Sequence, residues 1–502
     1  MRKERSDKDM KTEMKVLFAA SEARPFIVTG ALADIAESLP QSLVRKGVDC
    51  RVVIPLYSMI PYNQREDFSF VTSFTVKLSW RKLYCGVFKT ERDGVIYYFI
   101  DNEHYFHRYN LFEGFDNAEK YAFFSLAVLE MLPHIDFQPD VIHANDWETA
   151  LVPIFRHIHY AQSSFYSGIK TVFSIHNIAF QGITDFSIFG DVFGFPDWAG
   201  NLVDYDGRIN LTKGAMETCH AMVISSRSYA REIEGECTDM SGYDYGSGLT
   251  PFFRERKRKL TTIPNGVDGN DFDPLHDVCL SKNYGKTNFR SGKKENKTWL
   301  QVLLSLEKDP DVPIVAMISK INSQYEGCQR ILDTINKGLM DDNHMQFVLL
   351  GNAASGEIAS AFSDFADRYP GRAAVFLSFN PLLAKKILAG ADIMYAPLSY
   401  EPFSTTQIIA LRYGTISLIR NTGGLADMAY DSIGGEGICF NYSQNEGDDL
   451  KAAIERALNA FSNKKEWNML VRSAMKCDYS WDNHAANEYI KLYNSLCITT
   501  AN

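Results

Sequence analysis

Short apolar runs alternate with longer amphipathic stretches twice along this chain. In the first half, the runs that predict strands span residues 16–20, 49–55, 141–144, 171–175 and 221–225. The stretches that predict helices between them span 31–46, 118–132, 148–159 and 226–234. The second half repeats the alternation, with strands predicted at 314–319, 346–350, 373–377, 392–396 and 415–419, and helices at 328–337, 358–369, 381–389, 406–413 and 449–462. Asp93-Gly94 between two further runs, 87–92 and 95–100, predicts a hairpin.

Buried strands joined by helices form parallel sheets that are covered on both faces. Two such sets therefore predict an α/β protein with two Rossmann-like, doubly wound domains. After a mobile charged extension at 1–13, residues 14–262 are expected to form the first domain, 263–310 a linker region and 311–483 the second domain. Within the linker region, 280–298 is polar and basic, as in a surface loop. Ligands of such sheets bind beyond the carboxyl ends of the strands, so an interdomain cleft is the expected site.

The composition is that of a globular protein, with 45% hydrophobic and 23% charged residues among 502. The net charge of −10 and the lack of a clustered basic stripe argue against a nucleic-acid partner. No apolar run approaches about 18 residues, so no transmembrane helix is predicted, and the first residues lack the apolar core of a signal peptide. The nine cysteines form no C-x-x-C pair, which predicts reduced thiols in a cytoplasm and no zinc site.

The most informative loop lies between the first predicted strand and the first predicted helix. Val28-Thr29-Gly30-Ala31 directly precedes the amphipathic stretch. A helix N-terminus offers free backbone N–H groups and the positive end of the helix dipole. This loop therefore predicts a phosphate-binding site.

Together with Ser21-Glu22-Ala23-Arg24-Pro25-Phe26, this loop resembles the donor-binding loop of bacterial glycogen synthases and plant starch synthases. Five further stretches resemble the same family in the same order, each at a predicted strand end or loop: 143–153, 172–182, 263–268, 400–407 and 422–427. The resemblance covers the chain from Val16 to about Leu496. It implies the glycosyltransferase-B arrangement, with residues 484–502 packing back on the first domain.

The reaction that the resemblance implies is the retaining transfer of glucose from ADP-glucose to the non-reducing end of an α-1,4-glucan. The first domain is then the acceptor side and the second domain the nucleotide-sugar side. The resemblance implies no metal, and no cofactor besides the donor substrate ADP-glucose. Glycogen or a maltooligosaccharide is the expected partner. The chemistry requires neutralisation of the leaving diphosphate, hydrogen bonds to the sugar and exclusion of water.

The resemblance carries over a set of sugar-holding residues that match the family. His176, Glu401 and Asp146 match catalytic positions. The donor- and substrate-binding positions are matched by Glu22, Thr29, Gly30, Asn177, Asn265, Lys320, Ser404, Thr405, Gly423 and Gly424. The three catalytic candidates also have structural interpretations: Asp146 as a helix cap, His176 as a satisfied strand-end histidine and Glu401 as an acid before a helix.

The positions that should neutralise the diphosphate depart from the family pattern. The family loop has Lys-Thr-Gly-Gly, whereas here Val28 replaces the lysine and Ala31 replaces the second glycine. After the first strand of the second domain, Lys320 replaces an arginine and Tyr325 replaces a lysine. One of three expected cations therefore remains. Losing a single donor to a developing anion costs on the order of 10²–10³ in rate.

Further departures affect the same region. Glu148 replaces a histidine, and Phe403-Ser404-Thr405 replaces Cys-Gly-Leu at a helix N-terminus that should cradle phosphate. Arg24 and Lys385 are conceivable substitutes for the lost cations, although the sequence places neither in the cleft. The alternative is neutral drift within an active enzyme.

Aromatic residues are dense between 105 and 115, at Tyr105, Phe106, Tyr109, Phe112 and Phe115. Exposed rings stack on sugar faces, so this segment predicts a glucan-binding surface, with core packing as the alternative.

Three hypotheses about activity follow. The first is an ADP-glucose-dependent α-1,4-glucosyltransferase with weakened activity. The second is a catalytically inactive glucan-binding or regulatory paralogue that acts beside an intact glycogen synthase, and the lost cations favour it modestly. The third is a glycosyltransferase with another donor, because Val28 and Tyr325 change the phosphate pocket.

Overall fold

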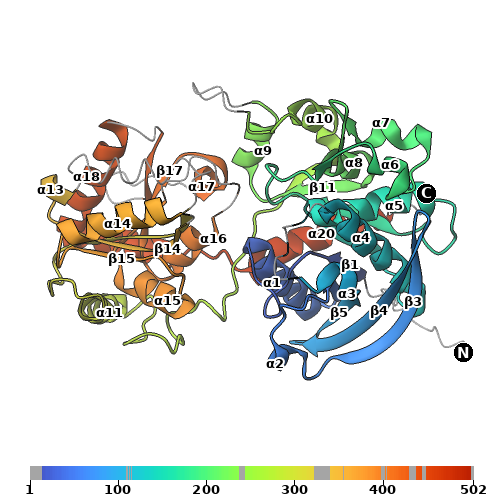
Figure 1. The fold of residues 1–502 in the computed structure, drawn as a ribbon. Helices are drawn as coiled ribbons and strands as arrows, with labels where there is room; N and C mark the ends of the chain where they lie inside the picture. The colour runs from blue at the N-terminus through green and yellow to red at the C-terminus, as the bar shows by residue number, and fades with distance from the viewer. Residues whose placement is uncertain are drawn as a thin grey trace, which may run out of the picture. The chain divides into compact units, whose positions relative to one another are not determined.

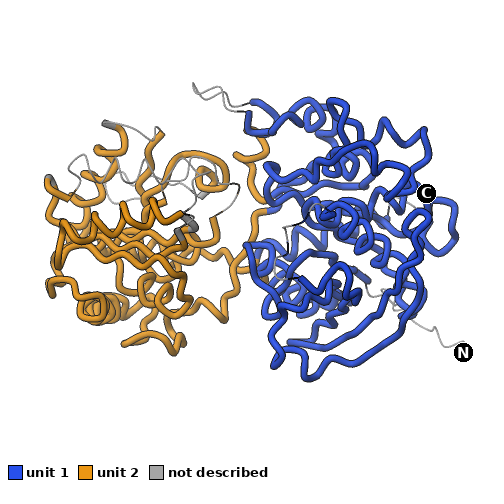
Figure 2. The backbone as a smooth tube through the Cα atoms, in the orientation of Figure 1, with its two compact units in different colours: residues 1–224, 233–263, 484–502 blue, residues 225–232, 264–483 orange. Residues whose placement is uncertain are grey.

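The computed structural model describes residues 14–498 apart from 109–110, 112–113, 115, 237–243, 322–339, 354, 397–401, 403, 429–436 and 444–447. The chain divides into two compact units (Figure 2). Unit 1 comprises residues 1–224, 233–263 and 484–502, and unit 2 comprises residues 225–232 and 264–483. The helix predicted at 328–337 lies outside the described residues, as do Tyr109, Phe112, Phe115, Tyr325, Glu401 and Phe403.

Unit 1 is built on a nine-stranded sheet (Figure 1). In sheet order, its strands are β12 (Leu260–Thr262), β11 (Ala221–Ile224), β7 (Lys170–Ser174), β6 (Val141–Asn145), β1 (Lys15–Ala19), β2 (Asp49–Pro55), β5 (Val95–Asp101), β4 (Arg81–Arg92) and β3 (Ser69–Leu78). The strands from β12 to β5 are parallel, and β4 and β3 extend the sheet in antiparallel fashion. The parallel strands confirm the predicted α/β fold class, and Arg92 opposite Val95 confirms the predicted hairpin.

Helices cover both faces of this sheet. The longer ones are α1 (Ala31–Arg45), α4 (Asn117–His134), α5 (Leu151–His159), α8 (Leu211–Thr218) and α20 (Ala486–Ile498). The connection through α1 leads from β1 to β2, whereas the connection through α5 leads in the opposite direction across the sheet, from β6 to β7. Because both crossovers between parallel strands are right-handed, α1 and α5 lie on opposite faces.

Shorter elements complete unit 1. They are α2 (Tyr62–Arg65), α3 (Glu103–Phe106), η1 (Trp147–Thr149), α6 (Ile188–Asp191), η2 (Asp197–Ala199), α7 (Gly200–Val203), α10 (Thr250–Glu255) and η3 (Lys257–Lys259), with a small sheet of β8 (Ile183–Thr184), β10 (Arg208–Asn210) and β9 (Asp204–Tyr205). The short element η5 (Trp481–Ala485) crosses from unit 2 into unit 1. Helix α9 (Arg227–Ile233) crosses the boundary of the two units, and most of it belongs to unit 2.

The C-terminal helix α20 packs within unit 1 although it follows unit 2 in the chain. Tyr489 and Tyr493 are buried there. The hydroxyl group of Tyr493 lies 2.8 Å from Nδ1 of His143, whose Nε2 lies 2.6 Å from Oγ of Ser174. Burial lowers the pKa of His143 to about 3, so this imidazole is neutral at physiological pH.

Unit 2 contains a six-stranded parallel sheet. In sheet order, its strands are β15 (Ala373–Phe376), β14 (Gln346–Ala353), β13 (Ile314–Ile321), β16 (Ile393–Ala396), β17 (Ile416–Arg420) and β18 (Cys439–Tyr442). The helices described around it are α11 (Phe289–Leu303), α13 (Met340–Asp342), α14 (Gly356–Arg368), α15 (Pro381–Gly390), α16 (Thr405–Arg412), α17 (Gly423–Met428), α18 (Asp448–Ser462) and α19 (Lys464–Ala474).

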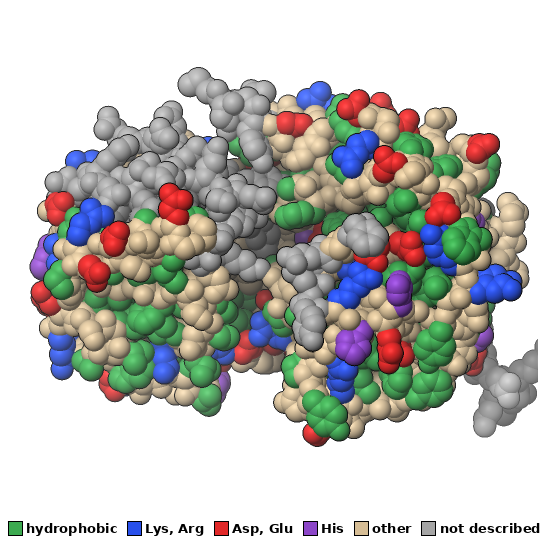
Figure 3. All heavy atoms as spheres, in the orientation of Figure 1, with side chains coloured by type: hydrophobic (Ala, Val, Ile, Leu, Met, Phe, Trp, Pro, Cys, Tyr) green, Lys and Arg blue, Asp and Glu red, His purple; other side chains and the backbone are tan. Residues whose placement is uncertain are grey.

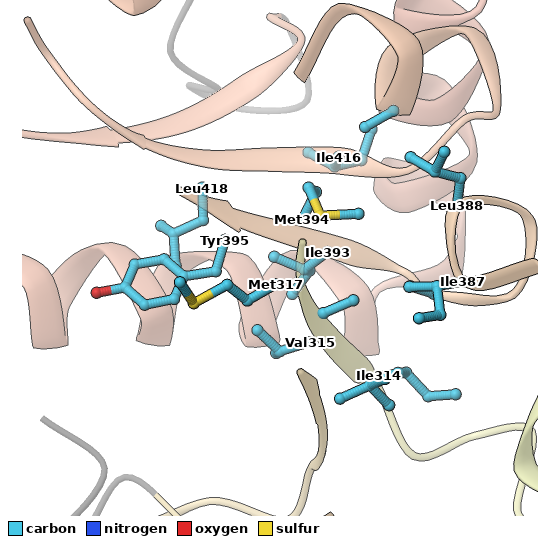
Figure 4. Close-up of a cluster of buried hydrophobic side chains, with 14 of the residues drawn as sticks. Ile314, Val315, Met317, Ile387, Leu388, Ile393, Met394, Tyr395, Ile416 and Leu418 are labelled. Carbon is cyan, nitrogen blue, oxygen red and sulfur yellow. The ribbon is translucent and has the colours of Figure 1, made fainter. Parts of the chain in front are cut away.

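The core of unit 2 lies between the central strands and the helices beside them. In Figure 4, Val315 and Met317 of β13 lie beside Ile393 and Tyr395 of β16. All four side chains are more than nine-tenths buried. The continuous apolar character of β13 and β16 fits strands that are covered on both faces.

The surface loop predicted at 280–298 is wrong, because much of this stretch forms the start of α11 and packs into unit 2. Nζ of Lys293 is buried and donates hydrogen bonds to the carbonyl oxygens of Ala389, Ala391 and Tyr413. Burial lowers the pKa of Lys293 to about 7. Lys297 forms a buried ion pair with Asp392, with 2.7 Å between Nζ and Oδ2. The lysines that suggested a solvated loop therefore form hydrogen bonds to carbonyl groups and an ion pair with a carboxylate inside unit 2.

Candidate active site

In the loop after β1, the carboxylate of Glu22 lies at the N-terminus of α1. The Glu22 carboxylate accepts hydrogen bonds from Thr29 N–H, the Thr29 hydroxyl group and Gly30 N–H, at 2.5, 2.6 and 3.2 Å from Oε2. Glu22 is buried, and a Cβ atom on Gly30 would lie 3.2 Å from its other oxygen. A carboxylate is stabilised at a helix N-terminus for the same reason as a phosphate. The predicted phosphate position in unit 1 therefore already contains a protein anion.

The same loop lacks a cation directed at this position. Val28, at the expected lysine position, is 49% exposed, and Ala31 is also exposed. Arg24 is the one basic residue between 21 and 31, and its Nε lies 2.6 Å from Asp34 Oδ1 and 3.8 Å from Glu37 Oε2 on α1. Arg24 is thus engaged with acidic side chains of the helix.

Asp146 and His176 come together at the carboxyl ends of the neighbouring strands β6 and β7. Oδ1 of Asp146 accepts a hydrogen bond from His176 N–H at 2.8 Å. Asp146 has a φ of +55° and makes no side-chain cap to η1. The helix-cap interpretation of Asp146 is therefore wrong, because its side chain connects two strand ends instead.

Asn145 fixes the tautomer of His176. Nδ2 of Asn145 donates to the carbonyl oxygens of Ala19 and His143, at 3.0 and 3.3 Å. Its Oδ1 must therefore accept from His176 Nε2–H, at 3.0 Å. Burial lowers the pKa of His176, although the Asp146 carboxylate opposes this shift. The result is a neutral imidazole whose Nδ1 keeps a lone pair with no partner among the described residues.

Glu148 adds a third carboxyl group to this end of the sheet. It is buried, and its Oε2 has no hydrogen-bond partner among the residues that the structure describes. Burial first, then the charges of Asp146 and Glu22, raise the pKa of Glu148 well above its usual range. Burial likewise raises the pKa of Asp146. Glu22, Asp146 and Glu148 thus form an acidic cluster near His176, in which Glu22 and Glu148 are buried and Asp146 is half-buried.

Replacing Glu148 tests whether this carboxyl group is protonated at neutral pH. A group with a raised folded-state pKa binds more protons in the folded than in the unfolded state, so its contribution to stability is lost as pH rises. Glu148→Gln should therefore become steadily more stable than the natural chain above the unfolded pKa of about 4.5, by up to about 1.4 kcal/mol per pH unit. Urea unfolding of both proteins from pH 5 to pH 8 measures the difference. A constant difference would contradict the protonated state.

Asn177 supports the turn after His176. Its Oδ1 accepts a hydrogen bond from Ala179 N–H at 3.0 Å, and its own backbone N–H lowers the pKa of Asp146 by hydrogen bonding. In unit 1 the structure thus brings together Glu22, Thr29, Gly30, Asp146, Glu148, His176 and Asn177.

Unit 2 contains a second glycine segment, Thr422-Gly423-Gly424, in which a backbone N–H group also donates a hydrogen bond to a carboxylate. Oε1 of Glu232 on α9 accepts from Gly423 N–H at 2.8 Å and from the Thr422 hydroxyl group at 3.0 Å. Asp427 of α17 accepts from the N–H groups of Arg227 and Ser228 at the start of α9. Gly423 at the start of α17 and Asp427 near its end are therefore both bonded to α9.

The remaining candidates in unit 2 lie at strand and helix ends. Lys320 pairs with Asn352 near the end of β13, and Ser404 directly precedes Thr405 at the start of α16. Asn265 is buried, and its Oδ1 has no partner among the described residues. Lys385 is bonded to Asp271, with 2.7 Å between Nζ and Oδ1. Like Arg24, Lys385 is engaged in an ion pair.

The glucan-binding surface predicted at 105–115 is wrong for its described aromatic residues. Tyr105 and Phe106 are 1% exposed, because α3 packs them against Phe123 of α4. The core-packing alternative therefore holds for these two rings.

Two residues with clear roles at these sites were not predicted. Asn145 orients His176, and Glu232 bonds the second glycine segment. Asn145 directly precedes Asp146 at a predicted strand end, and this position could have identified it as a site residue. Glu232 lies inside a predicted helix, about 190 residues from its partner, and local sequence carries no information on such a contact.

Comparisons with known proteins show the family of this chain. The family model of the starch synthase catalytic domain matches residues 15–255. A glycogen synthase from Clostridium kluyveri is 41% identical over 487 residues, covering 96% of this chain and 100% of the relative. The chain belongs to the glycogen synthase and starch synthase family. Another glycogen synthase, from Desulforamulus reducens, is 40% identical and covers 96% of this chain and 99% of the relative.

The chain is also similar in fold to solved structures. The catalytic domain of starch synthase IV from Arabidopsis thaliana, bound to ADP and acarbose, matches 97% of this chain and 100% of its own, with a TM-score of 0.87 and 26% identity. A sucrose-phosphate synthase from Thermosynechococcus elongatus, 13% identical over 97% of this chain and 100% of its own, has a TM-score of 0.61 and shows the fold alone. The predicted family and the glycosyltransferase-B fold are confirmed.

Other site classes find no support in the described part of the chain. None of its helices is long and apolar enough to cross a membrane. No group of three or more His, Cys, Asp or Glu side chains among the described residues is arranged to hold a metal ion. On the face shown in Figure 3, the described basic side chains are interspersed with acidic ones and form no continuous stripe.

Proposed function

We propose that this chain transfers glucose from ADP-glucose to the non-reducing end of an α-1,4-glucan, with retention and at a reduced rate. The single observation that supports transfer is the arrangement of His176. Its neutral imidazole is oriented by Asn145 and its backbone by Asp146. The Nδ1 lone pair can accept a hydrogen bond from a sugar hydroxyl group without bringing a competing charge near the reacting carbon.

The reduced rate follows from the donor-phosphate region. Charge develops on the leaving diphosphate as the glycosidic bond breaks, and cations nearby would stabilise it. At the N-terminus of α1, the Glu22 carboxylate accepts the N–H groups of Thr29 and Gly30, and Val28 carries no charge. The diphosphate therefore lacks the lysine that the family pattern places beside the Glu22 carboxylate, and Lys320 is the one cation kept from that pattern. Activity at least ~10²-fold below that of a typical family enzyme is expected.

Incubation of the purified chain with radiolabelled ADP-glucose and either maltotriose or glycogen tests this function. We expect slow incorporation of label into glucan, and an α-1,4-specific hydrolase should release that label again. His176→Ala should lower the rate strongly. Turnover in the ordinary enzyme range of roughly 1–10³ s⁻¹ would contradict the proposed rate reduction. Incorporation from another nucleotide sugar alone would contradict ADP-glucose as donor.

The second candidate function is an inactive glucan-binding paralogue that acts beside an intact glycogen synthase. The uncharged Val28 beside the Glu22 carboxylate favours it, because the lysine of the family pattern is missing from the loop where that carboxylate lies. It predicts glycogen binding in affinity electrophoresis without any incorporation of label. Measurable transfer that His176→Ala removes would exclude this candidate.

The cytoplasm is the compartment that we propose for either function. The cysteines that the structure describes as free include Cys50, Cys85 and Cys219, all buried. Unpaired buried thiols fit a reducing compartment.

A further inference from the structure

An exposed tryptophan at the turn between β3 and β4 is held in one orientation. Trp80 is 70% exposed, although an indole ring is usually well buried. Its Nε1–H donates a hydrogen bond to Asp191 Oδ1 at 2.7 Å. The guanidinium group of Arg81 lies over the ring, 4.5 Å from its centroid. With one face under Arg81 and most of the side chain still exposed, the opposite ring face is left open to solvent.

The groups that hold the ring are themselves fixed. Arg81 donates to the Asp191 carboxylate at 2.8 Å and forms an ion pair with Glu119 at 3.3 Å. Glu119 in turn accepts a hydrogen bond from the buried hydroxyl group of Tyr105 at 2.6 Å. Hydrogen bonds from Arg81 and Trp80 lower the pKa of Asp191, so the carboxylate stays ionised. The network connects the exposed ring to the core of unit 1.

The turn itself is docked on the segment that contains α6. Ser79 adopts a φ of +55°, and its hydroxyl group donates to the carbonyl oxygen of Gly190 at 2.9 Å. Figure 1 shows the β3–β4 hairpin running along the edge of unit 1 to the region of α6. The Trp80 platform, meaning Trp80, Arg81 and Asp191, is therefore rigid before any ligand arrives, which lowers the entropic cost of binding.

Strand directions place the Trp80 platform at the same edge of the sheet as the candidate active-site residues. Strand β4 is antiparallel to β5, and β3 is antiparallel to β4, so β3 runs in the direction of the parallel strands. The turn at Ser79-Trp80 follows the carboxyl end of β3, as His176 follows the carboxyl end of β7. Six strand spacings separate β7 from β3, about 29 Å measured across the strands.

We propose that the Trp80 platform binds an α-1,4-glucan chain as a second glucan site in unit 1, separate from the transfer site. The open indole face stacks on the apolar face of a glucose ring, and the Asp191 carboxylate accepts hydrogen bonds from its hydroxyl groups. A glucan polymer presents many chains, so one chain held at Trp80 raises the local concentration of others near His176. The inference rests on the proposed function, which names a glucan as acceptor.

Trp80→Ala tests the platform, with Phe70→Ala as matched control. Phe70 lies on β3 of the same hairpin and is 58% exposed, but its ring packs on Phe88 instead of being held by hydrogen bonds. Affinity electrophoresis in glycogen gels should show about tenfold weaker binding for Trp80→Ala, unchanged binding for Phe70→Ala and an intermediate effect for Trp80→Phe, which keeps a ring face. Thermal melting shows whether each variant is folded.

The outcomes separate this inference from the proposed function. Equal glycogen affinity of Trp80→Ala and the natural chain would overturn the platform, whatever the transfer assay shows. Loss of glycogen binding in Trp80→Ala without any transfer by the natural chain would support the platform and contradict the proposed transferase. Transfer to maltotriose should be unchanged in Trp80→Ala. If the substitution changes self-association in sedimentation without changing glycogen affinity, the ring serves a protein contact and the inference fails.

Discussion

The combined variant Val28→Lys, Lys320→Arg, Tyr325→Lys and Ala31→Gly should transfer glucose from ADP-glucose at least ~10²-fold faster than the natural chain. It restores the cations and the glycine that the family pattern places at the diphosphate. A lysine at position 28 would stand beside the Glu22 carboxylate, which accepts Thr29 N–H and Gly30 N–H. The added charge offsets that anion and favours a bound diphosphate. Initial rates with labelled ADP-glucose and maltotriose measure the change.

Single substitutions should recover less than the combined variant, because cations around one diphosphate act as a unit. Tyr62→Lys is the matched control, since it adds the same charge on α2, where Tyr62 is 82% exposed. That variant should leave the rate unchanged. If the combined variant binds ADP-glucose and glucan but stays inactive, charge neutralisation is not the defect. Ser404, which directly precedes α16, and its sequence neighbour Phe403 would then be the next positions to replace.

The fold was largely predictable because most strands of the two large sheets are buried and parallel. Such strands are short, apolar and separated by amphipathic helices, so the bounds of β2 and β6 agree with the prediction to within one residue. The edge strand β3 was missed, since most of its residues are exposed or half-buried and form no apolar run. Helix α11 was predicted as a loop because its lysines look solvated, whereas Lys293 and Lys297 bond carbonyl and carboxylate groups inside unit 2.

The candidate site was predictable as a set of positions but not as a set of contacts. Strand ends locate Asp146 and His176, and the loop before α1 locates Thr29 and Gly30. Nothing local indicates that Glu22 fills the N-terminus of α1. The segment at 105–115 shows the same limit, since a cluster of rings has the same composition on a surface and in a core. Burial decides between these interpretations, and burial depends on distant parts of the chain.

Asn145→Ala should reduce transfer about 10²-fold by releasing His176, although Asn145 does not itself reach the sugar in the proposed mechanism. The Asn145 side chain fixes Nε2–H of His176 through Oδ1, and its Nδ2 is bonded to the carbonyl oxygens of Ala19 and His143. Without it, the imidazole can turn and exchange tautomers, so Nδ1 no longer accepts reliably from a sugar hydroxyl group. Leaving buried carbonyl groups unpaired should also lower the free energy of unfolding by about 1–3 kcal/mol.

A double-mutant cycle distinguishes positioning from a general loss of stability. If Asn145 acts through His176, the variant that combines Asn145→Ala with His176→Ala should be no slower than His176→Ala alone. Rates are measured in the background that carries the restored cations, at a temperature where melting curves show every variant folded. Multiplicative losses would show that Asn145 contributes independently of the imidazole. Nitrogen-15 shifts of labelled histidine provide a readout without turnover: the natural chain should show a protonated Nε2 and an unprotonated Nδ1 at His176, and Asn145→Ala should show a mixture of tautomers.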